Sequence, residues 1–417
     1  MSEKETGTLW TRDFTIITAG SAVSMFGNAM SGFAMSLMVL DYTESTLLYA
    51  VYLAVFTIPQ IIVPIISGAV LDRFSRRRTI YTLDFLSSVL YLIAAFILAG
   101  GWFSFPVFAL YVFLIGTIHS IYLVAYSSFY PLLITKGNYS KAYSVSSVLE
   151  TMSAIMVPVA TFVYKQVGIS PLLAANALCF FLAAVMETRI ADKYENYVEL
   201  QKKTEDKEHK GRMVLRDIRE GFDYLTGNKG LTAIVLYFTV SAMVYGATNV
   251  LTLPWFRASF ENGEYIFMVV VGMAVVGRAV GGALHYRMRI PPEKKFRIAF
   301  FVYIVTAILE GTYLYLSLPL GALFCFMSGI LGVTSYTIRV SATQAYVPDE
   351  KKGRFNGAFN MLNTCGSLAG ELTAGWLALM ISPRLVISGY MAFCLLSAFV
   401  FIWTRRREVA AIYNVEQ

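Results

Sequence analysis

Residues 68–78 read GAVLDRFSRRR and decide the fold, because they form a short charged connection between two long apolar runs. Residues 46–69 and 79–99 make up these runs, and neither run contains Lys or Arg. Each is long enough to cross a hydrocarbon core, which takes about 20 apolar residues of helix. The arginines between them indicate the cytoplasmic side of a membrane, where short loops carry an excess of positive charge.

Apolar runs of this kind recur along the whole chain. Of its 417 residues, 57% are hydrophobic and 15% charged, and the mean hydropathy is +0.59. Soluble domains are about half apolar and about a quarter charged. We therefore predict an all-α integral membrane protein with twelve transmembrane helices. The predicted spans are residues 14–40, 46–69, 79–99, 106–130, 143–164, 172–190, 231–253, 265–284, 298–316, 320–342, 355–380 and 385–403.

One polar stretch divides the predicted spans into two halves of six. We expect an N-terminal six-helix bundle at 1–191, a cytoplasmic linker at 192–229, a C-terminal six-helix bundle at 230–404 and a cytoplasmic tail at 405–417. Val214, Ile218, Phe222 and Leu225 recur at helical spacing within the linker, with charged residues between them. This pattern predicts an amphipathic helix that lies on the membrane surface and tethers the linker.

The basic residues set the orientation of the chain. With the N-terminus inside, only Lys165, Arg257 and Arg384 of the 34 Lys and Arg residues fall on the outer side. The net charge of +7 is therefore a topological signal and does not indicate nucleic-acid binding. The first apolar run is too long for a signal peptide and lacks a cleavage site. We expect a multi-pass protein of the inner (plasma) membrane with both termini in the cytoplasm.

The charged connection also carries a motif. Gly68, Asp72 and Arg73, followed by a basic cluster from Arg76, resemble the loop signature of the major facilitator superfamily. A positive-inside loop explains the arginines, but it does not explain Gly68 and Asp72 at those offsets. A carboxylate at a helix end can face the positive N-terminus of a neighbouring helix and pair with Arg. We predict a breakable cytoplasmic latch in which Asp84 holds an arginine or accepts a bond from the same loop.

Within that superfamily the chain resembles the exporter branch that includes macrolide-efflux and siderophore-efflux permeases. The resemblance rests on residues 24–46, on the latch loop and on residues 343–360. It implies two pseudo-symmetric bundles around a central cavity and alternating access. The chain departs from the branch at Gly27-Asn28, where Gly-Asp is common, so a carboxylate that could carry a proton is absent there.

Ionisable residues inside the predicted spans are candidates for coupling, because a charge at the bilayer centre costs about 2.5 to 3.5 kcal/mol on insertion scales. Glu150 and Arg278 lie at matching depth, and the resemblance implies that their helices face each other. We predict an inter-domain gate; the alternatives are two separate polar contacts or a permanent buried pair. His119 is a proton carrier, a substrate contact or an interhelical hydrogen-bond partner. Glu371 is a further cavity candidate.

Two more ionisable residues have structural rather than functional interpretations. Glu310 falls in the ninth span, which is usually peripheral, and Arg339 is expected to snorkel towards the cytoplasmic surface. Spans one, four, seven and ten supply polar and aromatic residues that face a cavity or pack between helices. These candidates are Asn28, Tyr122, Tyr126, Tyr245, Asn249 and Tyr336. Rings with a polar tip favour an amphipathic organic substrate.

The sequence therefore predicts a secondary active transporter that exports an amphipathic small molecule, such as a drug, a macrolide-like compound or a siderophore, by proton antiport. Nutrient import or lipid flipping by the same fold are the alternatives. The chain contains no G-x-x-x-x-G-K-[ST] loop for ATP, and no metal-ligand or redox spacing among its four cysteines. We expect no enzyme activity, no cofactor and no nucleic-acid partner. The protein is expected to act as a monomer in the lipid bilayer.

Overall fold

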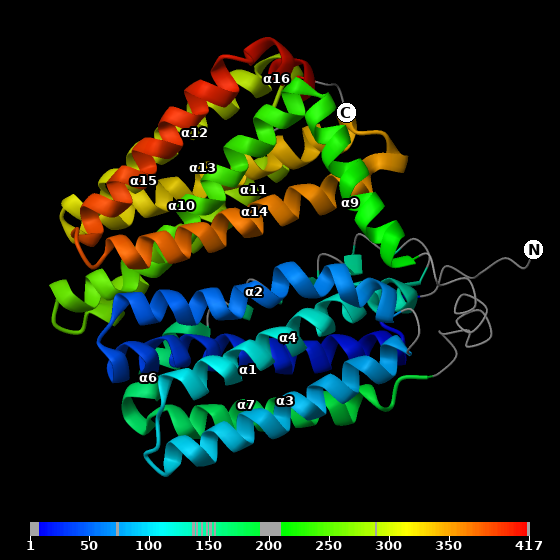
Figure 1. Ribbon diagram of the computed structural model, residues 1–417, viewed down its shortest axis with the longest axis vertical. Coiled ribbons are helices and arrows are strands. Elements are labelled where there is room, and N and C mark those ends of the chain that lie inside the picture. Colours follow the sequence, from blue (N-terminus) through cyan, green and yellow to red (C-terminus); the bar gives the residue numbers. More distant parts are fainter. Residues whose placement is uncertain are drawn as a thin grey trace, which may run out of the picture. The chain divides into compact units, whose positions relative to one another are not determined.

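The computed structural model describes residues 8–71, 75–135, 138, 141–142, 145–146, 149, 152–153, 156–191, 210–287 and 290–414, and this part of the chain is helical with no strand (Figure 1). Within it, ten segments are long and apolar enough to cross a membrane. They are built on α1 (Arg12–Thr43), α2 (Thr46–Leu71), α3 (Arg76–Ala99), α4 (Phe105–Phe129), α7 (Ile169–Glu187), α10 (Lys229–Ser259), α11 (Gly263–Arg287), α12 (Lys295–Thr312), α13 (Leu318–Tyr346) and α15 (Pro383–Ser397). The predicted helical membrane class is confirmed.

The predicted fifth and eleventh spans are not among these ten. In the fifth, α6 (Met156–Val167) covers the described part, and several residues between 143 and 155 lie outside it. In the eleventh, α14 (Asp349–Leu377) is a continuous helix but a polar one, because it carries Asn356, Asn360, Asn363 and Glu371. Among the described residues, ten segments therefore qualify as spans by length and hydropathy, whereas the sequence predicts twelve.

Contacts between residues divide the chain into two compact units. Residues 1–44 and 55–212 form the first unit, and residues 45–54 and 213–417 form the second. The chain therefore changes unit inside α2 as well as within the predicted linker. The first turns of α2 belong to the core of the second unit, where Ala50 is fully buried and a side chain at Gly375 of α14 would clash with it.

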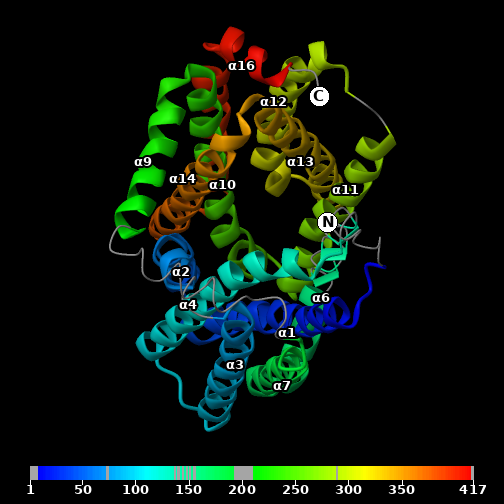
Figure 2. The same cartoon turned by 90° about the vertical axis from the view of Figure 1, so that its right-hand side faces the viewer.

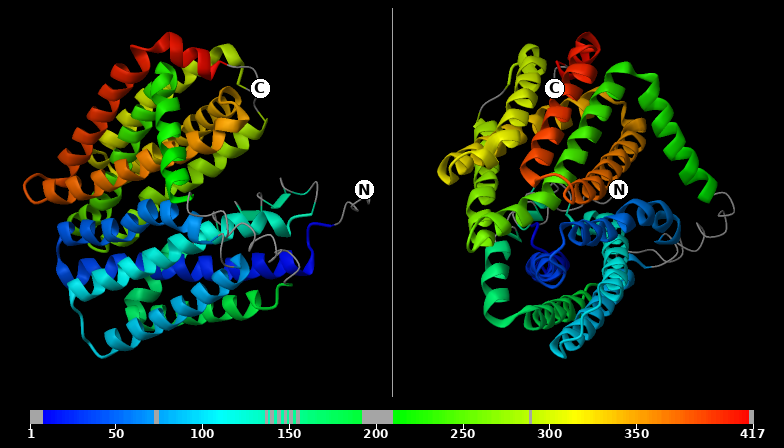
Figure 3. Two further views of the ribbon diagram at one scale, coloured as in Figure 1. Left: turned by 45° about the vertical axis from the view of Figure 1, so that its right-hand side comes forward. Right: turned by 60° about the vertical axis from the view of Figure 1, so that its left-hand side comes forward.

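Close helix packing in the second unit depends on glycine. α10 and α14 lie side by side (Figure 1), and a Cβ atom at Gly246 or at Gly370 would clash with the backbone of the other helix. Lipid tails are as apolar as the helix surfaces, so helices in a membrane associate by close packing of small residues and not by a hydrophobic driving force. The views in Figure 3 show the same bundle of helices from two other sides.

A helix is present in the second half of the predicted linker. α9 (Lys210–Gly227) contacts the N-terminal end of α14, where Glu220 lies 2.5 Å from the guanidinium of Arg354. A Cβ atom at Gly221 would lie 2.7 Å from the Arg354 carbonyl oxygen, and the Lys351 ammonium lies 4.8 Å from the centre of the Tyr224 ring. Side-chain contacts with α14 therefore hold this end of the linker.

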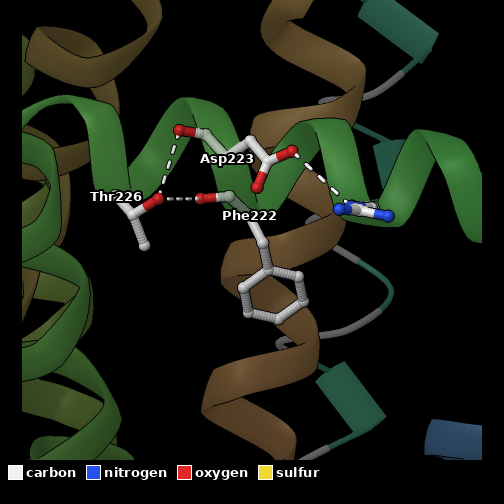
Figure 4. A network of polar contacts seen from close by, with 4 residues as sticks. Phe222, Asp223 and Thr226 are labelled. Carbon is white, nitrogen blue, oxygen red and sulfur yellow. Dashed lines mark hydrogen bonds and ion pairs between the residues drawn. The ribbon is translucent and has the colours of Figure 1, made fainter.

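The last turns of α9 are reinforced from within (Figure 4). The Thr226 hydroxyl donates to the carbonyl oxygens of Phe222 and Asp223, at 3.0 and 3.2 Å, and the Arg219 Nε atom lies 4.0 Å from Asp223 Oδ2. Leu225 is buried beneath them, whereas the side chains of Val214 and Ile218 lie outside the described residues. An exposed pair such as Arg219 and Asp223 contributes little to stability.

The predicted cytoplasmic tail contains a docked helix, α16 (Arg406–Tyr413), which lies near α12 (Figure 2). The Tyr413 side chain is fully buried, and its hydroxyl lies 2.7 Å from that of Tyr303 on α12. Burial raises the pKa of the Tyr413 phenol, so the pair is neutral at physiological pH. The Phe296 amide also donates to Asn414 Oδ1 at 3.1 Å, which fixes the end of α16.

We predict that Tyr413→Phe destabilises the protein by about 1 to 3 kcal/mol, because it leaves the buried Tyr303 hydroxyl without a partner. The measurement is the apparent melting temperature of the full chain in detergent. Tyr42→Phe is the control, because that side chain is half exposed at the end of α1. Equal melting temperatures for the two variants would show that the Tyr303 to Tyr413 contact contributes nothing.

Candidate functional site

The second unit contains a cavity of about 550 Å³ between five of its helices. α10, α12, α13, α14 and α15 all contribute to its wall. This volume lies within the range of about 300 to 1,000 Å³ that is usual for small-molecule sites. Six aromatic rings form much of the lining. They belong to Tyr237, Phe238, Tyr245, Tyr303, Tyr336 and Phe359.

Arg339 is the positive charge of this cavity. Its guanidinium carbon lies 4.6, 4.8 and 5.4 Å from the ring centres of Phe359, Phe238 and Tyr336. Such contacts are cation–π interactions, which grow stronger when the cation is desolvated. Three aromatic rings thus hold the Arg339 guanidinium against the cavity wall, whereas its snorkelling towards the cytoplasmic surface stays a prediction.

Glu310 is the negative charge of the cavity. It accepts a hydrogen bond from the Ser328 hydroxyl and interacts electrostatically with Arg278 of α11. The peripheral place that the sequence predicts for this residue is not what the structure shows, because Glu310 lines the cavity. The cavity wall thus carries one acidic residue, Glu310, and one basic residue, Arg339, among its aromatic rings.

Several buried polar atoms of the lining have no hydrogen-bond partner among the described residues. They are Thr306 Oγ1, Asn363 Oδ1 and Arg339 Nε. A buried polar atom without a partner costs about 1 to 3 kcal/mol, so native proteins leave few of them. Three in one cavity indicate a site that a bound molecule or water completes.

Two of the predicted cavity residues line this cavity. Tyr245 and Tyr336 are 65% and 61% exposed within its wall, whereas Asn249 is an exposed residue of α10 that is not part of the lining. The other three candidates belong to the first unit. Asn28 there accepts hydrogen bonds from the Tyr91 hydroxyl at 3.4 Å and the Asn176 amide at 3.5 Å.

The predicted coupling residues lie in different surroundings. His119 stacks on Phe56, with ring centres 5.9 Å apart. Glu371 is buried in α14 and accepts a hydrogen bond from Ser367 at 3.3 Å. Arg278 is described above, but Glu150 lies outside the described residues, so the predicted gate between them stays a prediction.

Part of the predicted latch can be located. Gly68 lies in α2 near its end, while Asp72 and Arg73 lie outside the described residues. Arg76 Nη1 lies 3.5 Å from the Ser128 carbonyl oxygen. Asp84 is buried in α3, and its carboxyl group faces a second carboxyl group.

That second carboxyl group belongs to Glu187, at the end of α7. Sequence reasoning missed this residue, although it lies within the predicted span 172–190 and is therefore a visible carboxylate in an apolar run. Tyr122 and Tyr126 of α4 stack on each other at 5.8 Å, and Tyr122 interacts electrostatically with both acids. The two tyrosines thus lie beside an acidic pair and not in the cavity of the second unit.

The helical membrane architecture and its ring-lined cavity can be compared with known families. The chain belongs to the Major Facilitator Superfamily, whose family model matches residues 17–370. Proteins of this superfamily are transporters of small molecules and not enzymes. The chain is therefore a multi-span membrane transporter.

Relatives of known sequence are distant. An uncharacterized MFS-type transporter of Bacillus subtilis, YkuC, is 23% identical over 67% of this chain and 68% of its own length. Macrolide efflux protein A of Streptococcus pyogenes is 24% identical over 66% of each chain. These matches span about two thirds of either protein.

Solved structures show the same fold. A bacterial homologue of the iron transporter ferroportin, in an inward-facing state, has a TM-score of 0.69 at 15% identity and covers 95% of this chain and 99% of that one. The nucleoside transporter NupG also has a TM-score of 0.69, at 13% identity over 94% and 98%. At such identities these structures support the fold and not a substrate.

We predict that Gly332→Phe fills the cavity without unfolding the protein. Gly332 lines the cavity, and nothing lies within 4 Å of a Cβ atom placed there. A Ser335→Cys reporter in the same wall should then react severalfold more slowly with a small thiol reagent, as located by mass spectrometry.

Gly272→Phe is the matched control, because Gly272 also has open space but is not part of the lining. Both variants should keep the apparent melting temperature of the parent. Equal labelling rates in the two variants would show that a side chain at position 332 does not fill the space through which the reagent reaches residue 335.

Proposed function

We propose that this transporter exports an amphipathic small molecule and binds it in the cavity of the second unit. The observation that carries the proposal is the combination of six aromatic rings with three buried polar atoms that have no partner. Rings supply apolar contact area, and a few polar groups fix the orientation of a ligand. The similarity to macrolide efflux proteins supports export over import.

The cavity favours a particular ligand chemistry. Arg339 Nε can donate a hydrogen bond, Asn363 Oδ1 can accept one, and Thr306 can do either. A matching molecule has an apolar body, at least one acceptor or negative group for Arg339, and a donor for Asn363. Macrolide-like compounds, other amphipathic drugs and siderophores all have this combination of groups.

For the fold we propose twelve spans in two six-helix bundles around a central cavity. The region of α6 and the polar helix α14 supply the two spans that hydropathy leaves out. A polar transmembrane helix is tolerated where its polar residues face protein or a water-filled cavity, and Asn363 of α14 lines the cavity of the second unit. Transport then proceeds by alternating access and proton antiport, in a monomer whose termini both face the cytoplasm.

The latch and the gate are parts of the same proposal. We place a cytoplasmic latch at Gly68, Asp72, Arg73 and Arg76, and an inter-domain gate at Glu150 and Arg278. The cavity supplies Arg278 with a second acidic partner, Glu310, which suits a side chain that changes partner during a cycle.

We predict that Glu150→Gln and Arg278→Ala each slow transport, because either change removes one charge of the gate. Initial transport rates of the two variants in proteoliposomes make the test, at matched protein content. If both variants transport at the parental rate, no such gate exists.

The substrate proposal is tested by binding and transport of fluorescent macrolides, dyes and siderophores. Arg339→Gln should weaken binding of an accepted compound about tenfold or more, which corresponds to about 1.4 kcal/mol. Arg384→Gln is the matched control, because that guanidinium also lies over rings, 4.7 Å from Trp255 and 5.8 Å from Tyr315, but outside the cavity.

The direction of substrate transport is measured in oriented proteoliposomes with an imposed pH gradient. Accumulation driven against the direction of proton flow supports export by antiport. Uptake in the direction of proton flow would indicate a nutrient importer, and movement of labelled lipid between leaflets would indicate a flippase. Equal binding by the Arg339 and Arg384 variants would remove the cavity from the proposal.

A further inference from the structure

The first unit contains a buried pair of carboxyl groups that the cavity does not use. Asp84 of α3 is 1% exposed and Glu187 of α7 is fully buried, and the two carboxyl groups interact with each other. Among the described residues, no N–H or O–H group donates to either oxygen of Glu187 or to Oδ2 of Asp84. Two acceptors therefore face each other without a donor.

Hydroxyl groups surround the pair. The Tyr122 hydroxyl, from α4, interacts with both acids and lies beside Ser21 of α1. Neither hydroxyl makes a well-formed hydrogen bond within the described residues, although Ser21 is 4% exposed. A Cβ atom at Gly20 would lie 3.5 Å from Glu187 Oε1, so α1 packs directly on the pair. Four helices thus meet around two carboxyl groups and at least two hydroxyl donors.

The charged groups near the pair contact the backbone. Arg77 Nη2 donates to the Thr188 carbonyl oxygen at 2.5 Å, Arg76 lies 3.5 Å from the Ser128 carbonyl oxygen, and Asp13 Oδ1 accepts from the Ala191 amide at 3.3 Å. Tyr126 is the remaining titratable group beside Tyr122. Glu187 is also the last residue of α7, where the negative end of the helix dipole disfavours an anion.

We propose that Asp84 and Glu187 together bind one proton, and that this proton is the one exchanged for substrate. The inference rests on the proposed function for its coupling role. A hydrogen bond between two carboxyl groups needs an O–H group on one of them. Two buried carboxylates that face each other, by contrast, repel each other. Loading transfers one proton from water to an oxygen of either acid, which forms an O–H···O bond across the α3 to α7 contact.

Release has a structural consequence. The proton returns to water and leaves two anions, which repel each other and can accept from the Tyr122 and Ser21 hydroxyls instead. Loading therefore ties α3 to α7, and release loosens that contact while it draws α4 and α1 towards the pair. The pair supplies a carboxylate in the first unit, where the first span carries Asn28 in place of an acid.

The test is infrared difference spectroscopy of the full chain in lipid nanodiscs, without substrate. We expect a carbonyl band of one protonated carboxylic acid at neutral pH, which disappears as the pH is raised. Glu187→Gln and Asp84→Asn should each abolish this titrating band. Glu264→Gln is the control, because Glu264 is a buried acid of the second unit, and it should leave the band unchanged.

Both neutral variants keep the size of the side chain, so each should fold, and the apparent melting temperature shows whether it does. In proteoliposomes, Glu187→Gln should bind substrate but no longer move protons with it. Three results overturn the proposal: a titrating band that survives in Glu187→Gln, unchanged proton movement in that variant, or stabilisation of the parent by Na⁺ instead of by acid.

The two proposals fail differently. If no compound is transported by the parent protein, the export proposal fails, while the infrared band still decides whether the pair holds a proton. If a compound is exported without proton movement, the coupling role fails even where the band is present.

Discussion

Hydrocarbon offers no hydrogen-bond partner, and the rest of the structure follows from that constraint. Backbone groups must be satisfied within each segment, so the described chain is helical. Polar side chains must find partners between helices, and most do so locally, as Asn28 does with Tyr91 and Asn176. The exceptions are therefore informative. Among the described residues, several of the buried polar atoms without a hydrogen-bond partner lie at two places, the cavity of the second unit and the acidic pair of the first.

In the proposed mechanism, these two places divide the work of a coupled transporter between the units. Arg339 is held among aromatic rings in the second unit, where a ligand with an apolar body and an acceptor fits. Asp84 and Glu187 face each other in the first unit, where the surroundings suit a single proton. Because each site lies within one unit, substrate and proton can be bound independently and coupled through the rearrangement of helices.

The sequence predicted the membrane class, the family and ten of the spans, because apolar runs and the Gly68 to Arg78 motif are local signals. Residues 355–380, most of which lie in α14, were predicted as one more apolar run, although the asparagines of α14 lower its hydropathy. Side-chain partners could not be predicted in the same way. Glu310 was assigned to a peripheral helix and Arg339 to the cytoplasmic surface, because a sequence does not show which face of a helix meets a cavity. Glu187 was visible as an acid in an apolar run, but its pairing with Asp84 depends on the contact between α3 and α7.

The division of α2 between the units has a consequence for how the polypeptide is assembled. Residues 45–54 precede the linker in the chain, yet Ala50 belongs to the core of the second unit. A chain cut within residues 192–209 would give a C-terminal fragment that lacks part of its own core. The second unit is therefore not an autonomous folding domain. It is completed by a segment that the ribosome makes first, so its core can close only when residues 45–54 are present.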